Sequence, residues 1–258
     1  MSAVVIDNKV VHYEVLGRGP PIVFLHGWVG SWRYWVPTMQ AISVRYRTYA
    51  IDLWGFGDTS NVADRYSLDA QVQLVESFLE QLGVARVALV GHALGGLIGL
   101  RFAARHPDLT ARVMAINTPL TAAAVNQRFR STAVDGLVEW LVDRGPDGAA
   151  IATESTKTDP PAIAATLTDL ESADVQAELA AIKAPALLVY GEKDPAIAAV
   201  EQVGADAAKL HNISFEESRH FPMLDATPQF NRLLLDFLEA GEDLDSLSLK
   251  DEWKRRMR

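Results

Sequence analysis

The chain has 258 residues, a net charge of −9 and a sequence pI near 5.1, with 49% hydrophobic and 22% charged residues. This length can bury a large core in one domain that carries an insertion. An acidic surface repels phosphate groups, so we expect neither nucleic acid nor a membrane surface as a partner. The absence of cysteine excludes disulfides, thiolate metal sites and a cysteine nucleophile.

The N-terminal residues contain no basic segment followed by a long apolar run, so we expect no signal peptide and a cytoplasmic protein. The most apolar stretch, residues 86–104, is interrupted by glycines and by His92. This pattern is typical of a buried strand followed by a helix and not of a membrane span.

The first half of the chain alternates between strand and helix patterns. Residues 4–6 and 10–15 are separated by Asp7-Asn8, which predicts a hairpin. Apolar spacing over residues 67–82 predicts a helix with Ser67 as its N-cap, and a second helix is expected at residues 95–105. Continuous Val-, Ile- and Leu-rich runs, typical of buried parallel strands, occupy residues 21–25, 47–53, 86–90 and 112–117. The alternation predicts a mostly parallel, doubly wound sheet.

The alternation stops after Asn117, where an Ala-rich helical stretch begins that predicts an inserted cap. Strand patterns return at residues 186–190 and 213–215, and a last core helix is expected from 228 to about 240. The charged tail is expected to form a solvated helix, with a docking role as the alternative. We therefore divide the chain into an α/β core, a helical cap and this tail, which are residues 1–117 with 182–240, residues 118–181, and residues 241–258.

The segment LVGHALGG, residues 89–96, lies where a strand is expected to turn into a helix. Many hydrolases place their nucleophile at such a turn, in the pattern G-x-S-x-G, because small neighbours let the strained chain pass. Gly91 and Gly95 occupy the two glycine positions, but Ala93 occupies the position of the serine.

Four other segments follow the same scheme. FLHGWVGSW places a His-Gly pair directly after an expected strand, and IDLWGFGDTS forms a glycine-rich loop after the next one. LLVYGEKDP places Asp194 just past a strand end, and SRHFPMLDATPQFN places His220 just before the last helix. The chain order of elbow, acid and histidine differs from the orders in chymotrypsin and subtilisin.

Together the five segments resemble the α/β-hydrolase superfamily, in its serine-esterase-like branch, over residues 1 to about 240. The resemblance implies a mostly parallel eight-stranded sheet flanked by helices, with a small helical cap inserted after the sixth strand. It also implies that Asp194 and His220 are the acid and base of a triad. The backbone N–H groups of Trp28 and Leu94 would form the oxyanion hole.

The remaining polar residues of these loops receive structural interpretations. Asp52 is expected to cap N–H groups of its turn. His26 is expected to shape the oxyanion loop, and His92 to pack beside the elbow. Asn117 lies where some relatives carry the acid, a role that an amide cannot serve. His12, His106 and His211 have no partner visible in the sequence.

Alanine has no oxygen with which to attack an acyl carbon, so the chain as written should not form an acyl-enzyme. Three explanations remain open. The serine of an active hydrolase was deliberately replaced, or the nucleophile was lost naturally and left a small-molecule binding protein. Alternatively, the His–Asp dyad abstracts protons without a nucleophile or cofactor.

Trp28, Trp32, Trp35 and Trp54 lie in the two loops expected to border the pocket, or else pack in the core. If two of them face the pocket, the ligand is apolar and ester-like or ketone-like. Neither a Walker-type loop nor a G-x-G-x-x-G pattern occurs, so we expect no nucleotide cofactor. No H-x-x-x-H pattern or carboxylate cluster suggests a metal site.

Overall fold

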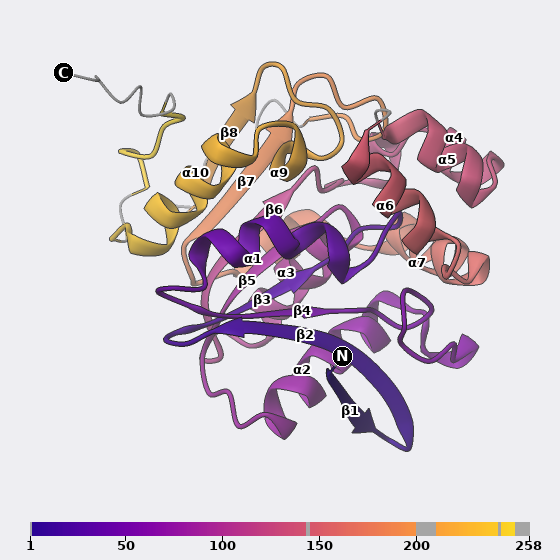
Figure 1. The fold of residues 1–258 in the computed structure, drawn as a ribbon, viewed down its shortest axis with the longest axis horizontal. Coiled ribbons are helices and arrows are strands. Elements are labelled where there is room, and N and C mark those ends of the chain that lie inside the picture. Colours follow the sequence, from indigo (N-terminus) through magenta and orange to yellow (C-terminus); the bar gives the residue numbers. More distant parts are fainter. Residues whose placement is uncertain (1, 143–144, 200–209, 242–243, 251–258) are drawn as a thin grey trace.

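A central sheet of eight strands organises the computed structural model, which describes residues 2–142, 145–199, 210–241 and 244–250 (Figure 1). The strand order is β1-β2-β4-β3-β5-β6-β7-β8. β2 runs antiparallel to β1 and β4, and all other neighbouring strands are parallel. The expected mostly parallel, eight-stranded sheet is therefore confirmed.

The strands are β1 (Ser2–Ile6), β2 (Lys9–Gly17), β3 (Pro21–Leu25), β4 (Arg47–Ile51), β5 (Val87–His92), β6 (Thr110–Ile116), β7 (Ala186–Gly191) and β8 (Leu210–Phe215). The α-helices are α1 (Val36–Ile42), α2 (Leu68–Gln81), α3 (Leu94–Arg105), α4 (Arg128–Ser131), α5 (Val134–Leu141), α6 (Pro146–Ser155), α7 (Pro160–Ser172), α8 (Val175–Ala181), α9 (Pro222–Asp225) and α10 (Thr227–Glu239).

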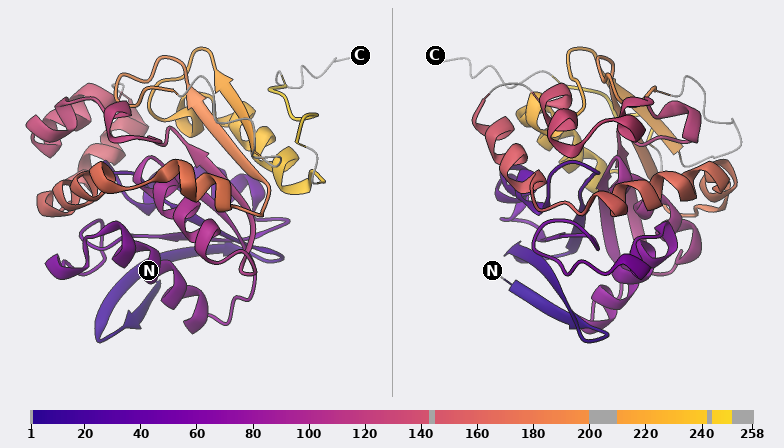
Figure 2. Two further views of the ribbon diagram at one scale, coloured as in Figure 1. Left: turned by 180° about the vertical axis from the view of Figure 1, so that it is seen from behind. Right: turned by 90° about the vertical axis from the view of Figure 1, so that its right-hand side faces the viewer.

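Helices cover both faces of the sheet, which explains why its central strands are apolar throughout. α1 and α10 pack together on the face seen in Figure 1, while α2, α3 and α8 lie on the opposite face, seen from behind in Figure 2. Every residue of β5 and of β7 is buried. Burial on two sides removes the alternation of polar and apolar residues that marks a half-exposed strand.

Local signals placed several elements correctly. Asp7 and Asn8 both have positive φ, 47° and 61°, as the tight turn of a twisted hairpin requires, and β1 pairs with β2 across them. Ser67 caps α2, where its side-chain oxygen accepts a hydrogen bond from the Ala70 N–H.

The segment between β6 and β7 is helical where it is regular, and its helices α4 to α7 lie together beyond one end of the sheet (Figure 2). The expected solvated tail helix is wrong for residues 244–250, which form a turn and irregular chain. Leu244 and Leu247 are buried there, because they pack against the core instead of facing water. The rest of that prediction falls on residues 242–243 and 251–258, outside the described residues. No helix in the described part of the chain is both long and apolar enough to cross a membrane.

Candidate active site

The turn between β5 and α3 places Ala93 at its apex, as the elbow pattern predicts. Ala93 has φ 48° and ψ −107°, a backbone conformation that side chains with a β-carbon rarely adopt. A methyl group added to Gly91 would lie 2.2 Å from the carbonyl oxygen of Gly95, and one added to Gly95 would lie 2.2 Å from that of Leu25. Only glycine fits at these two positions, so the turn has the tight, strained backbone that the elbow pattern predicts.

Beside this turn, His220 and Asp194 form a buried pair. Nδ1 of His220 lies 2.9 Å from Oδ2 of Asp194, and both side chains are 1% exposed. The His220 ring centroid is 4.7 Å from that of His92, the neighbour of Ala93. Because a carboxylate only accepts hydrogen bonds, Nδ1 carries the proton and Nε2 of a neutral ring keeps a lone pair. This arrangement suits the predicted roles of His220 as general base and of Asp194 as the acid that orients it.

The loop after β3 passes directly beside the elbow. A methyl group on Gly27 would lie 3.1 Å from Cβ of Ala93. Nδ1 of His26 donates to the carbonyl oxygen of Gly27 at 2.8 Å, and the Leu53 N–H donates to its Nε2 at 3.0 Å. Burial lowers the pKa of His26 and keeps it neutral, as this bonding requires. His26 thus shapes the turn that presents Trp28.

The predicted oxyanion donors belong to Leu94, which follows Ala93, and to Trp28, which follows Gly27. Leu94 is the first residue of α3, where an N–H group has no partner within the helix. Trp28 follows Gly27 and is fully buried. Their function as oxyanion donors stays a prediction.

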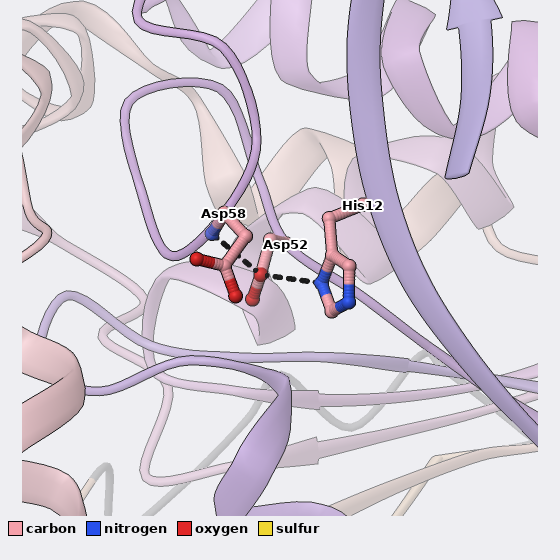
Figure 3. A group of neighbouring side chains, drawn as sticks. All are labelled: His12, Asp52 and Asp58. Carbon is pink, nitrogen blue, oxygen red and sulfur yellow. Dashed lines mark hydrogen bonds and ion pairs between the residues drawn. The ribbon is translucent and has the colours of Figure 1, made fainter. Parts of the chain in front are cut away.

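Asp52 organises the loop after β4 and takes no part in the pair (Figure 3). Its Oδ1 accepts the N–H of Trp32 at 2.9 Å, and its Oδ2 accepts the N–H of Asp58 at 2.9 Å. Nδ1 of His12 also lies 2.8 Å from Oδ2, a partnership that the sequence did not reveal. Potential ligand atoms of His12, Asp52 and Asp58 lie within 4.8 Å of one another. We assign the group to the loop structure, because hydrogen bonds already occupy the Asp52 oxygens.

Comparisons with known proteins agree with this architecture. The family described as alpha/beta hydrolase fold matches residues 20–142. The crystal structure of the enol-lactonase from Burkholderia xenovorans LB400 superimposes with a TM-score of 0.78, at 24% identity, over 93% of this chain and 100% of that one. The chain has the α/β-hydrolase fold.

Two curated relatives differ in how much of them the chain spans. The pimeloyl-[acyl-carrier protein] methyl ester esterase of Vibrio cholerae is 27% identical over 259 residues, which cover 89% of this chain and 98% of the relative. Epoxide hydrolase 3 of Xenopus tropicalis is 35% identical over 116 residues, but they cover 43% of this chain and 32% of that protein.

In this α/β-hydrolase fold, Asn117 joins the loops that carry Asp194 and His220. It has φ 43°, and its Nδ2 donates to the carbonyl oxygens of Arg219 and His220 at 2.9 and 3.0 Å. Its Oδ1 accepts the N–H of Gly191, at the end of β7, at 2.8 Å. From the sequence we recognised only that Asn117 cannot be the acid, and these three hydrogen bonds, which we call the Asn117 clamp, were not predicted.

Replacing Asn117 by aspartate should therefore destabilise the protein by roughly 1–3 kcal/mol, because a carboxylate oxygen replaces the amide donor that faces the carbonyl oxygens of Arg219 and His220. Asn126→Asp is the matched control, since Asn126 makes its side-chain hydrogen bonds at an exposed position. Urea unfolding measures both variants. Equal stabilities of the two variants would contradict the clamp.

The pair of His12 with Asp52 predicts a pH dependence of stability. Burial lowers the pKa of His12, but the hydrogen bond and charge of Asp52 outweigh burial and raise it overall. A raised pKa in the folded state gives stability that is fully present below about pH 6.5 and is lost as pH rises through the folded value. We expect His12→Asn to cost more stability at pH 5.5 than at pH 8.5 in urea unfolding. The difference between the two proteins isolates His12 from His26 and His92, whose lowered pKa values act in the opposite direction. A pH-independent difference would contradict this assignment.

The four tryptophans divide between core and insertion. Trp35 packs against Phe24 in the core, with ring centroids 4.9 Å apart. Trp54 is buried, and Trp32 lies 5.6 Å from the ring of His12. Trp28 faces the insertion, where its Nε1 donates to Oγ1 of Thr166 on α7 at 2.8 Å.

A cavity of about 390 Å³ lies among α4, α5 and α7. Its lining is largely apolar and includes Phe129, Leu137, Ile163 and Leu167. Phe129 separates it from the site, because its ring lines the cavity and lies 5.5 Å from that of Trp28 and 6.2 Å from that of His220.

Proposed function

We propose that the protein binds a carboxylic ester in a serine-hydrolase site that lacks its nucleophile, and therefore does not form an acyl-enzyme. One observation carries this proposal: an intact His220–Asp194 pair lies beside an elbow whose apex is Ala93. A β-carbon in such a backbone conformation costs of order 1–3 kcal/mol. The strained turn and the paired base are the parts that a serine nucleophile needs.

The ligand class follows from the surroundings of the pair. The cavity beside Phe129 has room for an apolar group of moderate size, and its lining is largely aliphatic. The names of two similar proteins, a methyl ester esterase and an enol-lactonase, support an ester or lactone. We infer a small ester-like or ketone-like ligand with an apolar part.

Each residue of the site then has a defined function toward a bound ester. The N–H groups of Trp28 and Leu94 donate to the carbonyl oxygen of the ester. His220 holds a basic Nε2 toward the position of the missing hydroxyl, and Asp194 fixes its orientation. No oxygen at Ala93 accepts the acyl group, so the ester stays intact.

Titration calorimetry with a short-chain aromatic ester tests this function. We expect saturable binding and recovery of the intact ester by chromatography. Ala164→Glu places a charge on an exposed residue that lines the cavity and should weaken binding. Val44→Glu, at a position that is 84% exposed, is the matched control. Absence of binding, or turnover above the uncatalysed rate, would contradict the proposal.

A second candidate is proton abstraction by the dyad alone, because His220 keeps its partner although no nucleophile is present. Such an enzyme would exchange the α-hydrogen of an apolar ketone with deuterated water, and His220→Gln would abolish the exchange. Exchange detected by proton NMR would place this function ahead of ester binding.

A further inference from the structure

We propose that Tyr34 and His92 are positioning residues, which tie the oxyanion loop to the backbone of His220 through one buried chain of hydrogen bonds. The chain begins at Gly27, beside the predicted donor Trp28, and ends at the predicted base. Its consequence for catalysis rests on the proposed function, whereas its effect on structure can be measured without any activity.

The direction of each hydrogen bond follows from the groups involved. Nε2 of His92 lies 2.7 Å from the carbonyl oxygen of His220, which can only accept, so Nε2 carries the proton. Nδ1 of His92 is then the acceptor, and the hydroxyl of Tyr34, 3.1 Å away, donates to it. The hydroxyl oxygen of Tyr34 in turn accepts the N–H of Gly27 at 2.6 Å. Each group in the chain has its proper partner.

This chain of hydrogen bonds is closed to solvent. Tyr34 is 5% exposed, His92 is fully buried and His220 is 1% exposed. The ring of Phe221 lies 5.6 Å from that of Tyr34 and 4.9 Å from that of His92, so it covers both. Burial holds the pKa of His92 well below its ordinary value. His92 therefore stays in the single neutral tautomer that the chain requires.

Close packing leaves the oxyanion loop little freedom to move against the elbow. A methyl group on Gly27 would lie 2.8 Å from Nδ1 of His92, in addition to its contact with Ala93. The loop and the base come from residues 27 and 220, far apart in sequence, yet two side chains join them. Displacement of reacting groups by about 1 Å can cost ~10²-fold in rate, so this link would set the geometry between donor and base.

Three substitutions distinguish the hydrogen bonds at the two ends of this hydrogen-bond chain. Tyr34→Phe removes one hydroxyl and leaves the ring. His92→Gln can keep the donor to the carbonyl oxygen of His220 but loses the acceptor for the Tyr34 hydroxyl. His92→Asn can keep the acceptor for the Tyr34 hydroxyl but loses the donor to His220. Tyr66→Phe is the matched control, because it removes a buried tyrosine hydroxyl that donates to Asp159 at 2.6 Å, away from this chain.

NMR of the unaltered Ala93 background gives the first readout, from the Gly27 amide and the Nδ1–H of His220. We expect Tyr34→Phe to shift both signals, although Tyr34 has no hydrogen bond to His220. We also expect His92→Gln, which can keep the donor to the His220 carbonyl, to shift the His220 signal less than His92→Asn, which removes that donor. Thermal unfolding checks that each variant is folded. An unchanged His220 signal in folded Tyr34→Phe, or an equal shift in Tyr66→Phe, would overturn the proposal.

Kinetics in the Ala93→Ser background give the second readout. Tyr34→Phe should lower kcat about 10–10²-fold and leave KM within about twofold, because positioning and not binding is lost. Tyr66→Phe should leave kcat unchanged. An unchanged kcat in Tyr34→Phe would contradict the catalytic part of the proposal. If Ala93→Ser itself is inactive, the proposed function fails, and the NMR result still decides whether the chain positions His220.

Discussion

Ala93→Ser is expected to give an esterase whose kcat exceeds that of the unaltered protein by ~10³-fold or more, since triad residues act as a unit. Serine adds one oxygen to an apex that already has φ 48°, beside a histidine held by its acid at 2.9 Å. The elbow glycines and the oxyanion loop need no rearrangement. Hydrolysis of a short-chain aromatic ester by the two proteins measures the gain.

Two controls make this result specific. Ala93→Gly should relieve the strained backbone and stabilise the fold, but gain no activity, because glycine supplies no oxygen. His220→Gln, added to Ala93→Ser, should remove the gained activity. A well-folded Ala93→Ser variant that remains inert would show that the site has lost more than its nucleophile.

Asp52→Ala is expected to lower the free energy of unfolding by roughly 3–5 kcal/mol, the cost of breaking a buried ionic pair by removing one partner. The substitution would leave His12 and the N–H groups of Trp32 and Asp58 without their acceptor in the fully buried environment of Asp52. Such a loss is a large fraction of the 5–15 kcal/mol typical of a folded protein.

Urea unfolding monitored by tryptophan fluorescence measures this effect. Asp58→Ala is the matched control, because the bond to Asp52 uses the backbone N–H of Asp58 and its side chain lies at an exposed position. Asp52→Asn keeps one acceptor oxygen and should fall between the two. A loss of less than about 1 kcal/mol in Asp52→Ala, the range of an exposed ion pair, would contradict the structural role.

The sequence predicted the fold because its signals are local. The runs at residues 21–25 and 86–90 are apolar throughout, which only strands covered on both faces can bury. Gly91 and Gly95 marked the elbow because a β-carbon at either position would meet backbone atoms. The order of Asp194 and His220 after that turn then predicted which side chains would meet.

Partnerships between distant residues could not be predicted in the same way. His12 meets Asp52 only because β2 pairs with β4, and no spacing along the chain expresses that register. His92 was expected only to pack, and its two hydrogen bonds depend on Tyr34 and on the loop before α9. In the tail, Leu244 and Leu247 are buried although charged residues surround them in the sequence, so the expected solvated helix does not form over residues 244–250.

Covalent labelling with a fluorophosphonate most directly tests whether the nucleophile is the one missing part of this site. Intact-mass spectrometry of Ala93→Ser should show one added phosphonyl group, and peptide mapping should place it at position 93. The unaltered protein and the double variant Ala93→Ser/His220→Gln should remain unlabelled. A folded Ala93→Ser protein without label, or a label on the unaltered protein, would contradict the account.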